Sequence, residues 1–151
     1  MSALLGQTVL VTGATGFLGQ ALVRRLAADG VHVRALARRL ERARAIRDLP
    51  GVTITLGDIR NEDDMRAAVE GCAVVFHVAA ALGGSYDAQY AANVMGTQTV
   101  ADVAARAGAG RFVHVSTISV YGYRNREDVT EATLPDPGAD PYHRTKLAAE
   151  H

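Results

Sequence analysis

Near its N-terminal end the chain carries a strand candidate, a glycine-rich turn and a helix candidate, in that order. The run Thr8-Val9-Leu10-Val11 has the length and β-branched content of a buried strand, and it leads directly into Thr12-Gly13-Ala14-Thr15-Gly16-Phe17-Leu18-Gly19. Apolar residues then recur at helical spacing from Gln20 to Ala27. Glycines let a backbone turn tightly and approach phosphates, and the first N–H groups of a helix attract negative charge. The segment therefore predicts a site for a dinucleotide pyrophosphate rather than a flexible loop.

The remaining sequence alternates apolar strand candidates with helical stretches. Further strands are expected at residues 31–36, 52–56, 73–79 and 111–116, and helices at 40–48, 62–70 and 86–107. Such alternation predicts a doubly wound α/β domain with a parallel sheet, right-handed crossovers and strand order 3-2-1-4-5. Ligands of these sheets bind at the carboxyl ends of the strands, near the switch between strands 1 and 4. The glycine turn would lie there.

Composition narrows the possible partners. The chain has 151 residues, 48% of them hydrophobic, and 16 basic side chains balance 16 acidic ones. It can bury one good core, and its neutral balance gives no electrostatic case for nucleic acid. No segment approaches the ~20 apolar residues needed to cross a bilayer. The single cysteine, Cys72, fits a reducing compartment. We therefore expect a cytoplasmic protein without a nucleic-acid or membrane partner.

The histidines do not indicate a metal site. His77 and His114 fall in the fourth and fifth strands, which are predicted neighbours, but neither belongs to an HxxxH or carboxylate pattern. Cys72 cannot build a zinc site alone. We interpret both histidines as core or sheet-end residues and expect no metal.

Tyr142 and Lys146 lie four residues apart in the segment Tyr142-His143-Arg144-Thr145-Lys146. Residues at this spacing share a helix face, so Lys146 would place its ammonium beside the phenol. A tyrosine titrates near ~10, and a fixed positive charge a few ångströms away lowers that pKa. The pair is then usable as a general acid or base. The spacing alone is also common on solvated helices, so it gains meaning only together with the glycine turn.

Six short motifs complete the pattern. They are Thr12-Gly13-x-x-Gly16-x-x-Gly19, Gly57-Asp58-Ile59-Arg60, His77-Val78-Ala79-Ala80, Asn93-Val94-x-Gly96-Thr97, Val115-Ser116-Thr117-x-x-Val120-Tyr121-Gly122 and Tyr142-x-x-x-Lys146. In this order they resemble the signature of extended short-chain dehydrogenases/reductases, the NAD-dependent epimerase/dehydratase family. Their joint occurrence covers nearly the whole chain and is far more specific than any one motif. The resemblance implies a Rossmann-type domain that binds a nicotinamide dinucleotide.

The resemblance implies which residues hold that cofactor. They are Gly13, Thr15, Gly16, Phe17, Leu18 and Gly19 in the turn, Asp58 and Ile59 at the adenine, Val78, Ala79 and Ala80 after the fourth strand, and Tyr142 and Lys146. Lys146 would bind the nicotinamide ribose hydroxyls. Asp58 can also be read as a turn or helix-capping carboxylate before the acidic cluster that follows. Within the family pattern the adenine contact is favoured.

The resemblance also implies catalytic roles for Thr117, Tyr142, Lys146 and Asn93. Thr117 matches the family's active-site Ser/Thr, whose hydroxyl would bond the substrate oxygen that Tyr142 protonates or deprotonates. Ser116 is the second choice because it alternates to the other face of the strand, and strand-end capping is the alternative for both hydroxyls. Asn93 would support the active-site helix and its waters, although an asparagine on a helix could equally be solvated.

The choice between NAD and NADP depends on the end of the second strand. NAD enzymes place a carboxylate roughly 20 residues after the glycines to bind the ribose 2′-hydroxyl. This chain has Arg38 and Arg39 there, with no acidic residue before Glu41. An arginine suits a 2′-phosphate. We expect NADP, read by Arg38, with NAD as the alternative. A solvated basic helix is the competing interpretation, and a nucleic-acid patch is disfavoured because no aromatic residue interleaves the run.

The expected activity is hydride transfer between C4 of the nicotinamide and the carbonyl or hydroxyl carbon of a small molecule. The strand at residues 33–38 looks more like the reductase branch, with dihydroflavonol-reductase-like and hydroxysteroid-dehydrogenase-like members. Epimerisation or dehydration of a nucleotide sugar shares the first step and is one alternative. A non-catalytic dinucleotide-binding regulator, or an inactive fragment, is another.

Members of the family continue past the Tyr–Lys helix with further strands and a C-terminal substrate domain, and a homodimer is common among them. Here the sequence ends inside that helix, at His151. We expect residues 1–151 to form the dinucleotide-binding domain alone, without the substrate domain. We also expect the isolated chain to bind the adenosine half of the cofactor weakly and to catalyse poorly.

Overall fold

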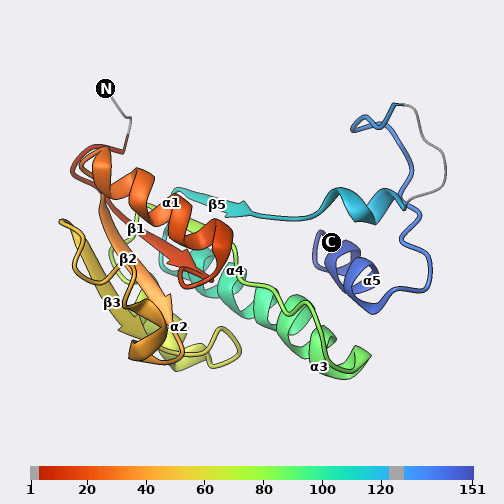
Figure 1. The fold of residues 1–151 in the computed structure, drawn as a ribbon, viewed down its shortest axis with the longest axis horizontal. Coiled ribbons are helices and arrows are strands. Elements are labelled where there is room, and N and C mark those ends of the chain that lie inside the picture. Colours follow the sequence, from red (N-terminus) through yellow and green to blue (C-terminus); the bar gives the residue numbers. More distant parts are fainter. Residues whose placement is uncertain (1–3, 123–127) are drawn as a thin grey trace.

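Five parallel strands form one sheet in the order β3-β2-β1-β4-β5 (Figure 1). In a computed structural model, residues 4–122 and 128–151 are described. The strands are β1 (Thr8–Thr12), β2 (His32–Ala37), β3 (Val52–Leu56), β4 (Val74–His77) and β5 (Arg111–His114). The order expected from the sequence is confirmed, and the chain changes direction across the sheet between β1 and β4.

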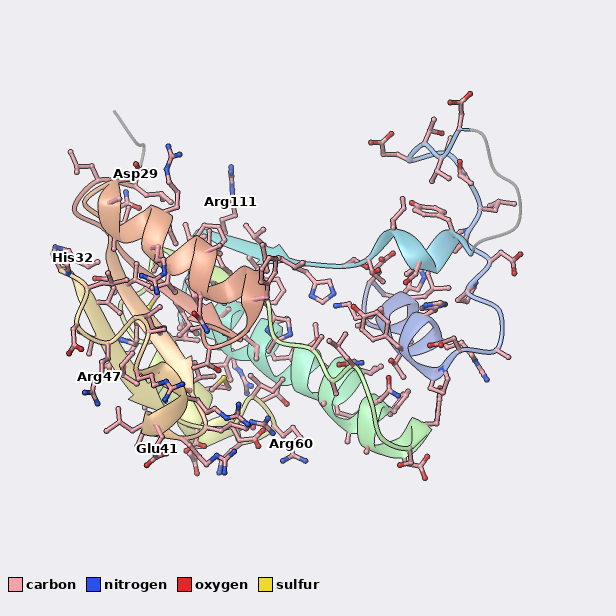
Figure 2. The ribbon with its side chains drawn as sticks, in the orientation of Figure 1. Asp29, His32, Glu41, Arg47, Arg60 and Arg111 are labelled. Atoms are coloured by element: carbon pink, nitrogen blue, oxygen red, sulfur yellow. The ribbon has the colours of Figure 1, made fainter. Side chains whose placement is uncertain are left out.

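Helices cover both faces of the sheet. Packed on one face is α1 (Phe17–Ala28), in a cluster with the inward side chains of β1 and β2. The other face carries α2 (Glu62–Val69) and α4 (Gly96–Arg106), which share a second cluster with Leu10 and Val75. The charged side chains labelled in Figure 2, among them Asp29, Arg60 and Arg111, lie on the outside of this assembly. None of the helices within residues 4–122 and 128–151 has both the length and the apolar character needed to cross a membrane.

The prediction of a helix at residues 40–48 is wrong. The structure has one 3₁₀ turn, η1 (Leu40–Ala43), followed by turns up to β3. Backbone bonds from Ile46 to Ala43 and from Leu49 to Ile46 continue this tight winding. A 3₁₀ segment rises about 2.0 Å per residue against 1.5 Å in an α-helix, so it returns to the start of β3 with fewer residues. Ala43 and Ile46 are nevertheless buried, which explains why their spacing looked helical.

The long helix expected at residues 86–107 is interrupted. It consists of α3 (Tyr86–Tyr90), a π-helical turn η2 (Ala91–Met95) and α4. The π turn carries Asn93, whose side chain is buried and bonded to other segments. A π turn inserts one extra residue into a helix and is frequent at functional sites. A regular helical period therefore predicted the extent of this element but not its internal geometry.

The last helix, α5 (Pro141–Ala148), lies beyond the carboxyl end of β5, beside α3 and the 3₁₀ turn η3 (Ile118–Tyr121) (Figure 1). Asp140 is its N-cap and accepts hydrogen bonds from the backbone N–H groups of Tyr142 and His143. Pro141 occupies the first helical position, where no N–H is needed. These two residues start the helix that carries Tyr142 and Lys146.

Candidate active site

The glycine turn is shaped by two close backbone approaches. Gly13 has φ +65°, and a Cβ added there would lie 2.6 Å from the backbone nitrogen of Ala79. A Cβ on Gly19 would overlap the carbonyl oxygen of Gly13. Neither position has room for a side chain. Only glycine therefore fits at these two positions, which is typical of a turn that binds a pyrophosphate.

Helix α1 begins inside this turn, at Phe17, one turn earlier than its apolar period indicated. Its N-cap, Gly16, has an extended conformation and supplies no capping side chain. Phe17 is 98% exposed and Leu18 is 49% exposed, so their side chains leave the helix start open. The Thr15 carbonyl accepts a hydrogen bond from Gln20 at 2.9 Å, which braces the turn. A positive helix end without its own cap suits an anion.

The loop after β4 is tied to the end of β1. Thr12 Oγ1 accepts hydrogen bonds from the backbone N–H groups of Val78 at 3.2 Å and Ala79 at 3.3 Å. These bonds end β4 at His77, two residues before the expected end of the strand. They also hold the residues expected beneath the cofactor, Val78 to Ala80, next to Gly13.

Asp58 and Ile59 follow β3, at the same edge of the sheet. The Asp58 carboxylate accepts bonds from Nε (3.0 Å) and Nη2 (2.8 Å) of Arg60 and from the Arg60 backbone N–H. This pairing holds the pKa of Asp58 at about 2. The turn interpretation of Asp58 is thus confirmed, whereas the cap of α2 is Asn61. Ile59 packs on Gly96 and the second core cluster. Contact of either residue with adenine stays a prediction.

Arg38 and Arg39 follow β2 directly and are exposed. Arg38 is close enough to Asp58 for its positive charge to contribute to the low pKa of that carboxyl. The basic end of β2 and the acidic residue after β3 therefore lie in one electrostatic neighbourhood beside the glycine turn.

Asn93 joins three segments. Its amide oxygen accepts a bond from the Ala81 N–H at 2.7 Å, and its amide nitrogen donates to the Ala81 carbonyl at 3.0 Å and to Thr145 Oγ1 at 3.0 Å. Thr145 in turn donates to the carbonyl of Tyr142 at 3.1 Å. Asn93 is 1% exposed, so the alternative of a solvated asparagine is wrong. It fastens the loop after β4 to α5.

Thr117 and Ser116 follow β5. The Thr117 hydroxyl accepts a bond from the Ser119 N–H at 3.3 Å and shares a 2.9 Å bond with the Ser119 hydroxyl, which makes it the cap of η3. Ser116 donates to the Glu150 carboxylate in a short hydrogen bond. The capping alternative thus holds for Thr117 in this structure, and its catalytic role stays a prediction.

Lys146 is 1% exposed and reaches back to the end of β5. Its Nζ donates to the Val115 carbonyl at 2.7 Å and lies 3.1 Å from Nε2 of His114. Tyr142, one turn earlier, is half-buried and packs against His143 with their rings 6.0 Å apart, edge to face. The buried cation is therefore fixed at the sheet edge and faces the space between β5 and α5.

Burial shifts the titration of the groups at this edge. It lowers the pKa of Lys146 to about 8, against the opposing effect of the Glu150 carboxylate. Burial also lowers the pKa of His77 to about 3 and that of His114 to about 4, and the Lys146 charge acts in the same direction on both. At neutral pH the lysine is therefore largely charged and both histidines are neutral. His77 is 0% exposed, which confirms the core interpretation, and His114 is a partly buried sheet-end residue.

Comparison with known proteins places this arrangement in a family. The sequence model of the NAD dependent epimerase/dehydratase family matches residues 9–151. The chain belongs to this family. All six motifs lie within the matched residues, so the resemblance seen in the sequence is confirmed.

Known proteins are similar in sequence to this chain over most of its length. Sterol demethylase protein B of Methylococcus capsulatus is 39% identical over an alignment of 151 positions, which covers 95% of this chain and 45% of the relative. The 2-alkyl-3-oxoalkanoate reductase of Stenotrophomonas maltophilia is 41% identical over an alignment of 149 positions, which covers 94% of this chain and 44% of the relative. The crystal structure of UDP-glucuronic acid 4-epimerase from Bacillus cereus, in complex with NAD, superposes with a TM-score of 0.85 at 29% identity, over 96% of this chain and 50% of that one. The chain thus spans about half the length of the curated relatives that it matches.

The sequence did not predict four of the contacts in the site. They involve the imidazole of His114, the carbonyl of Val115, the hydroxyl of Thr145 and the carboxylate of Glu150. One signal was available, because Thr12, His77 and His114 are polar residues that each end a strand after a run of apolar residues. A carbonyl that receives a lysine leaves no trace in a sequence.

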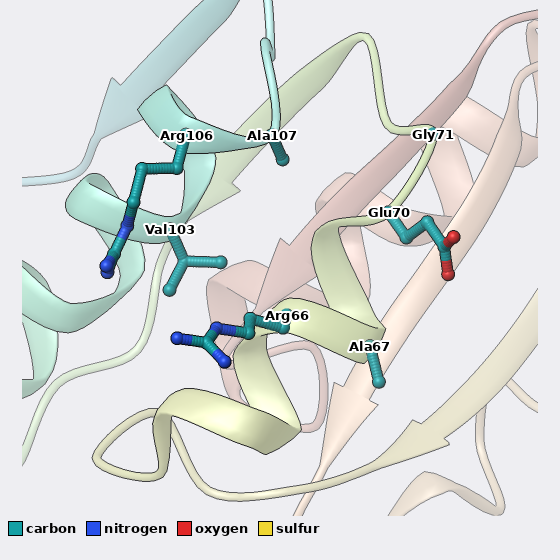
Figure 3. Close-up of a pocket in the computed structure, with 7 residues that line it drawn as sticks. All are labelled: Arg66, Ala67, Glu70, Gly71, Val103, Arg106 and Ala107. Atoms are coloured by element: carbon teal, nitrogen blue, oxygen red, sulfur yellow. The ribbon is translucent and has the colours of Figure 1, made fainter.

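One hollow lies away from this site (Figure 3). It measures about 520 Å³ and is lined by the ends of α2 and α4, with Arg66, Ala67, Glu70, Gly71, Val103, Arg106 and Ala107. Gly71 precedes β4, so the hollow is at the amino edge of the sheet, opposite the glycine turn. Arg66 and Arg106 both pair with Glu62 there. Within the described part of the chain, no group of three metal-ligating side chains is placed to hold an ion.

Proposed function

We propose that the chain is the dinucleotide-binding part of an NAD(P)-dependent oxidoreductase that acts on a carbonyl or hydroxyl carbon of a small molecule. The observation that carries this proposal is that the glycine turn, the Thr117 hydroxyl and Nζ of the buried Lys146 all lie at carboxyl ends of strands, at one edge of one sheet. Parallel sheets bind ligands at that edge. A nicotinamide dinucleotide, when bound, supplies the hydride.

The residues of the chain orient the substrate and the cofactor and supply a proton. Thr117 Oγ1 accepts the Ser119 N–H, and its own hydrogen can be donated to the substrate oxygen when the Ser119 hydroxyl is the donor in the bond that the two hydroxyls share. Tyr142 is the proton donor in reduction and the acceptor in oxidation. Lys146, held one helical turn away, provides the positive charge that favours the phenolate as the proton leaves. Asn93 keeps the helix of Tyr142 and Lys146 attached to the loop after β4.

For the cofactor we propose NADPH. Arg38 is exposed directly after β2, the position where a ribose carboxylate would stand in an NAD enzyme, and the carboxylate of Asp58 is already paired with Arg60. A guanidinium binds a 2′-phosphate through two parallel hydrogen bonds. NADH is the alternative, supported by the NAD complex of the Bacillus cereus epimerase.

Fluorescence titration separates these cofactors. NADPH should bind at least about tenfold more tightly than NADH, since one charge-assisted bond is worth about 1.5 kcal/mol or more. Arg38→Ala should remove this difference and leave NADH affinity unchanged. Arg111→Ala is the matched control, because Arg111 is exposed at the first residue of β5, on the other edge of the sheet (Figure 2). Equal binding of both nucleotides by the unaltered protein would contradict the proposal.

Among activities we propose a ketone reductase, because a relative that is 41% identical carries the name of an oxoalkanoate reductase. Consumption of NADPH with a ketone, abolished by Tyr142→Phe, is the expected result in the protein at its natural full length. The similarity to a UDP-glucuronic acid epimerase supports a second candidate, a nucleotide-sugar epimerase. Conversion of a nucleotide sugar without net cofactor turnover would favour it. A regulator would instead tolerate Tyr142→Phe and fail with Gly16→Val.

We further propose that these residues contribute the dinucleotide-binding domain and that the substrate is held mainly by sequence outside them. The named relatives support this, because less than half of their length corresponds to this chain. We place the protein in the cytoplasm, as a homodimer. Size-exclusion chromatography with light scattering on the full-length protein tests the dimer.

A further inference from the structure

Three polar side chains form a row across the sheet. Thr12 is the register partner of His77, and His77 is the register partner of His114, on neighbouring parallel strands. Partners in a parallel ladder point to the same face, and here the Thr12 hydroxyl bonds to Nδ1 of His77 at 2.8 Å. The two imidazoles stack with their centroids 5.5 Å apart and their planes 20° apart. The row ends at the ammonium of Lys146.

The hydrogen bonds of His77 fix its tautomer. Thr97 has one hydroxyl hydrogen, which it donates to the Asn93 carbonyl at 2.6 Å. Thr97 must therefore accept the second bond, the one it shares with Nε2 of His77 at 2.9 Å. Nε2 then carries the proton of the neutral ring. Nδ1 is the acceptor, and it receives the hydroxyl hydrogen of Thr12.

The neighbour of His77 must hold the opposite tautomer. The ammonium of Lys146 has donors only, so Nε2 of His114 at 3.1 Å has to accept. The proton of the neutral His114 ring then sits on Nδ1, an atom that is buried without a partner among the described residues. The charged and titratable groups facing this ring are Lys146, the neutral His77 and the Glu150 carboxylate. Only the lysine imposes a direction on Nε2.

We propose that His114 is a positioning residue for Lys146. Its neutral ring carries the proton on Nδ1, so Nε2 accepts a hydrogen bond from the ammonium and fixes the position of that cation. The proposal rests on the proposed function, in which Lys146 serves the nucleotide and the tyrosine. Val115 binds a second N–H of the ammonium at 2.7 Å. With two of three N–H groups held at known places, the third has one direction left for a ligand hydroxyl.

Spectroscopy of the ring nitrogens tests the tautomers without any assay of activity. In the protein at its natural full length, labelled with nitrogen-15 histidine, His114 should show a protonated Nδ1 at neutral pH, and His77 should show a protonated Nε2. His114→Gln and His77→Gln assign the two signals. Lys146→Met removes the donor, so the His114 proton should move to Nε2 while His77 is unchanged. A protonated Nε2 on His114 in the unaltered protein would overturn the proposal.

Kinetics of three variants test the consequence. Glutamine places its amide oxygen the same number of bonds from Cα as Nε2, whereas asparagine reaches only to the Nδ1 position. Phenylalanine keeps the stack on His77 and removes both nitrogens. We expect kcat/KM for the nucleotide to fall about tenfold in His114→Phe and His114→Asn and to recover within about threefold in His114→Gln.

The outcomes are separable from failure of the proposed function. Wild-type kcat/KM in a folded His114→Phe protein would overturn the positioning role even if both tautomers are as expected. Equal losses in the Gln and Asn variants would do the same, because a merely structural role does not discriminate the position of one oxygen. If the unaltered protein turns over no nucleotide, the function fails, and the spectra still decide the contact between His114 and Lys146.

Discussion

Replacement of Gly13 by alanine should cost far more than its backbone angle alone explains. A Cβ there would stand 2.6 Å from the nitrogen and 2.8 Å from Cα of Ala79, and the backbone cannot yield as a flexible side chain would. The positive φ of +65° costs a non-glycine residue ~1 kcal/mol or more. Displacing a packed segment adds ~1–3 kcal/mol. We therefore expect Gly13→Ala to lower the free energy of unfolding by about 3 kcal/mol.

Gly108→Ala isolates the angular contribution. Gly108 has φ +73°, nearly the same conformation, but a Cβ there meets nothing within 4 Å. Urea unfolding of this variant should show a loss of about 1 kcal/mol. The difference between the two variants, about 2 kcal/mol, then measures the contact between the glycine turn and the loop after β4. In melting temperature the Gly13 variant should lose ~6–12 °C.

Equal losses in the two variants would refute the argument, because they would mean that the approach of Ala79 carries no energy beyond the φ angle. The Gly13 variant has a second expected effect. Moving Ala79 also strains its bond to Thr12, so dinucleotide affinity should fall together with stability, whereas Gly108→Ala should leave affinity unchanged.

Three further predictions follow from the titrating edge and from the second face of the sheet. Burial lowers the pKa of Lys146 in the folded state from 10.5 to about 8, so between these two pH values the unfolded chain binds more protons than the folded chain. Stability should therefore rise with pH between about 8 and 10.5, by at most ~1.4 kcal/mol per pH unit, and Lys146→Met should remove this rise in urea titrations. Burial lowers the pKa of His77 in the folded state from 6.5 to about 3, so its contribution to stability is complete above pH 6.5 and is lost as the pH falls towards 3. His77→Gln should therefore reduce the loss of stability between pH 6.5 and 3. An unchanged loss in this variant would contradict the burial argument. Arg34 donates to the carbonyls of Ala68 at 2.7 Å and Glu70 at 2.8 Å at the end of α2, so Arg34→Met should cost about 1–2 kcal/mol in thermal unfolding, against little change in the exposed control Arg44→Met.

The strand order followed from the sequence because the strands are short segments rich in apolar residues that alternate with helical stretches, and because right-handed crossovers leave few ways to connect them. Strand ends were less predictable. The apolar run of β4 continues through Ala79, but the structure ends the strand at His77, where the Thr12 hydroxyl captures the next two N–H groups. The partner that ends the strand is 66 residues away in sequence. Local propensity contains no information about it.

Departures from regular helix were also invisible to periodicity. The buried pair Ala43 and Ile46 is three residues apart, a spacing that an α-helix and a series of 3₁₀ turns satisfy equally. At Asn93 the period continues across the π turn, because the extra residue is absorbed without breaking the helix. What requires the π turn is the set of bonds from the Asn93 side chain to Ala81 and Thr145, which are tertiary contacts.

The candidate site was predictable in its residue types and only partly in its contacts. Tyr142 and Lys146 were paired by their spacing, yet the hydrogen-bond partners of the ammonium are at the end of β5. A buried lysine has to satisfy its N–H groups, and the chain just after β5 offers it the carbonyl of Val115. The hydrogen-bond partners of the cation therefore come from the strand end and not from the helix that carries it.

Two groups at the end of β5 therefore fix the ammonium of Lys146, the Val115 carbonyl and Nε2 of His114. The same fixed position depends on a neutral His114, whose pKa of about 4 keeps the ring uncharged throughout the neutral range. Because a row of register partners supplies both the acceptor and the neighbour that stacks on it, the sheet itself, more than the helix, sets where the positive charge of the site resides.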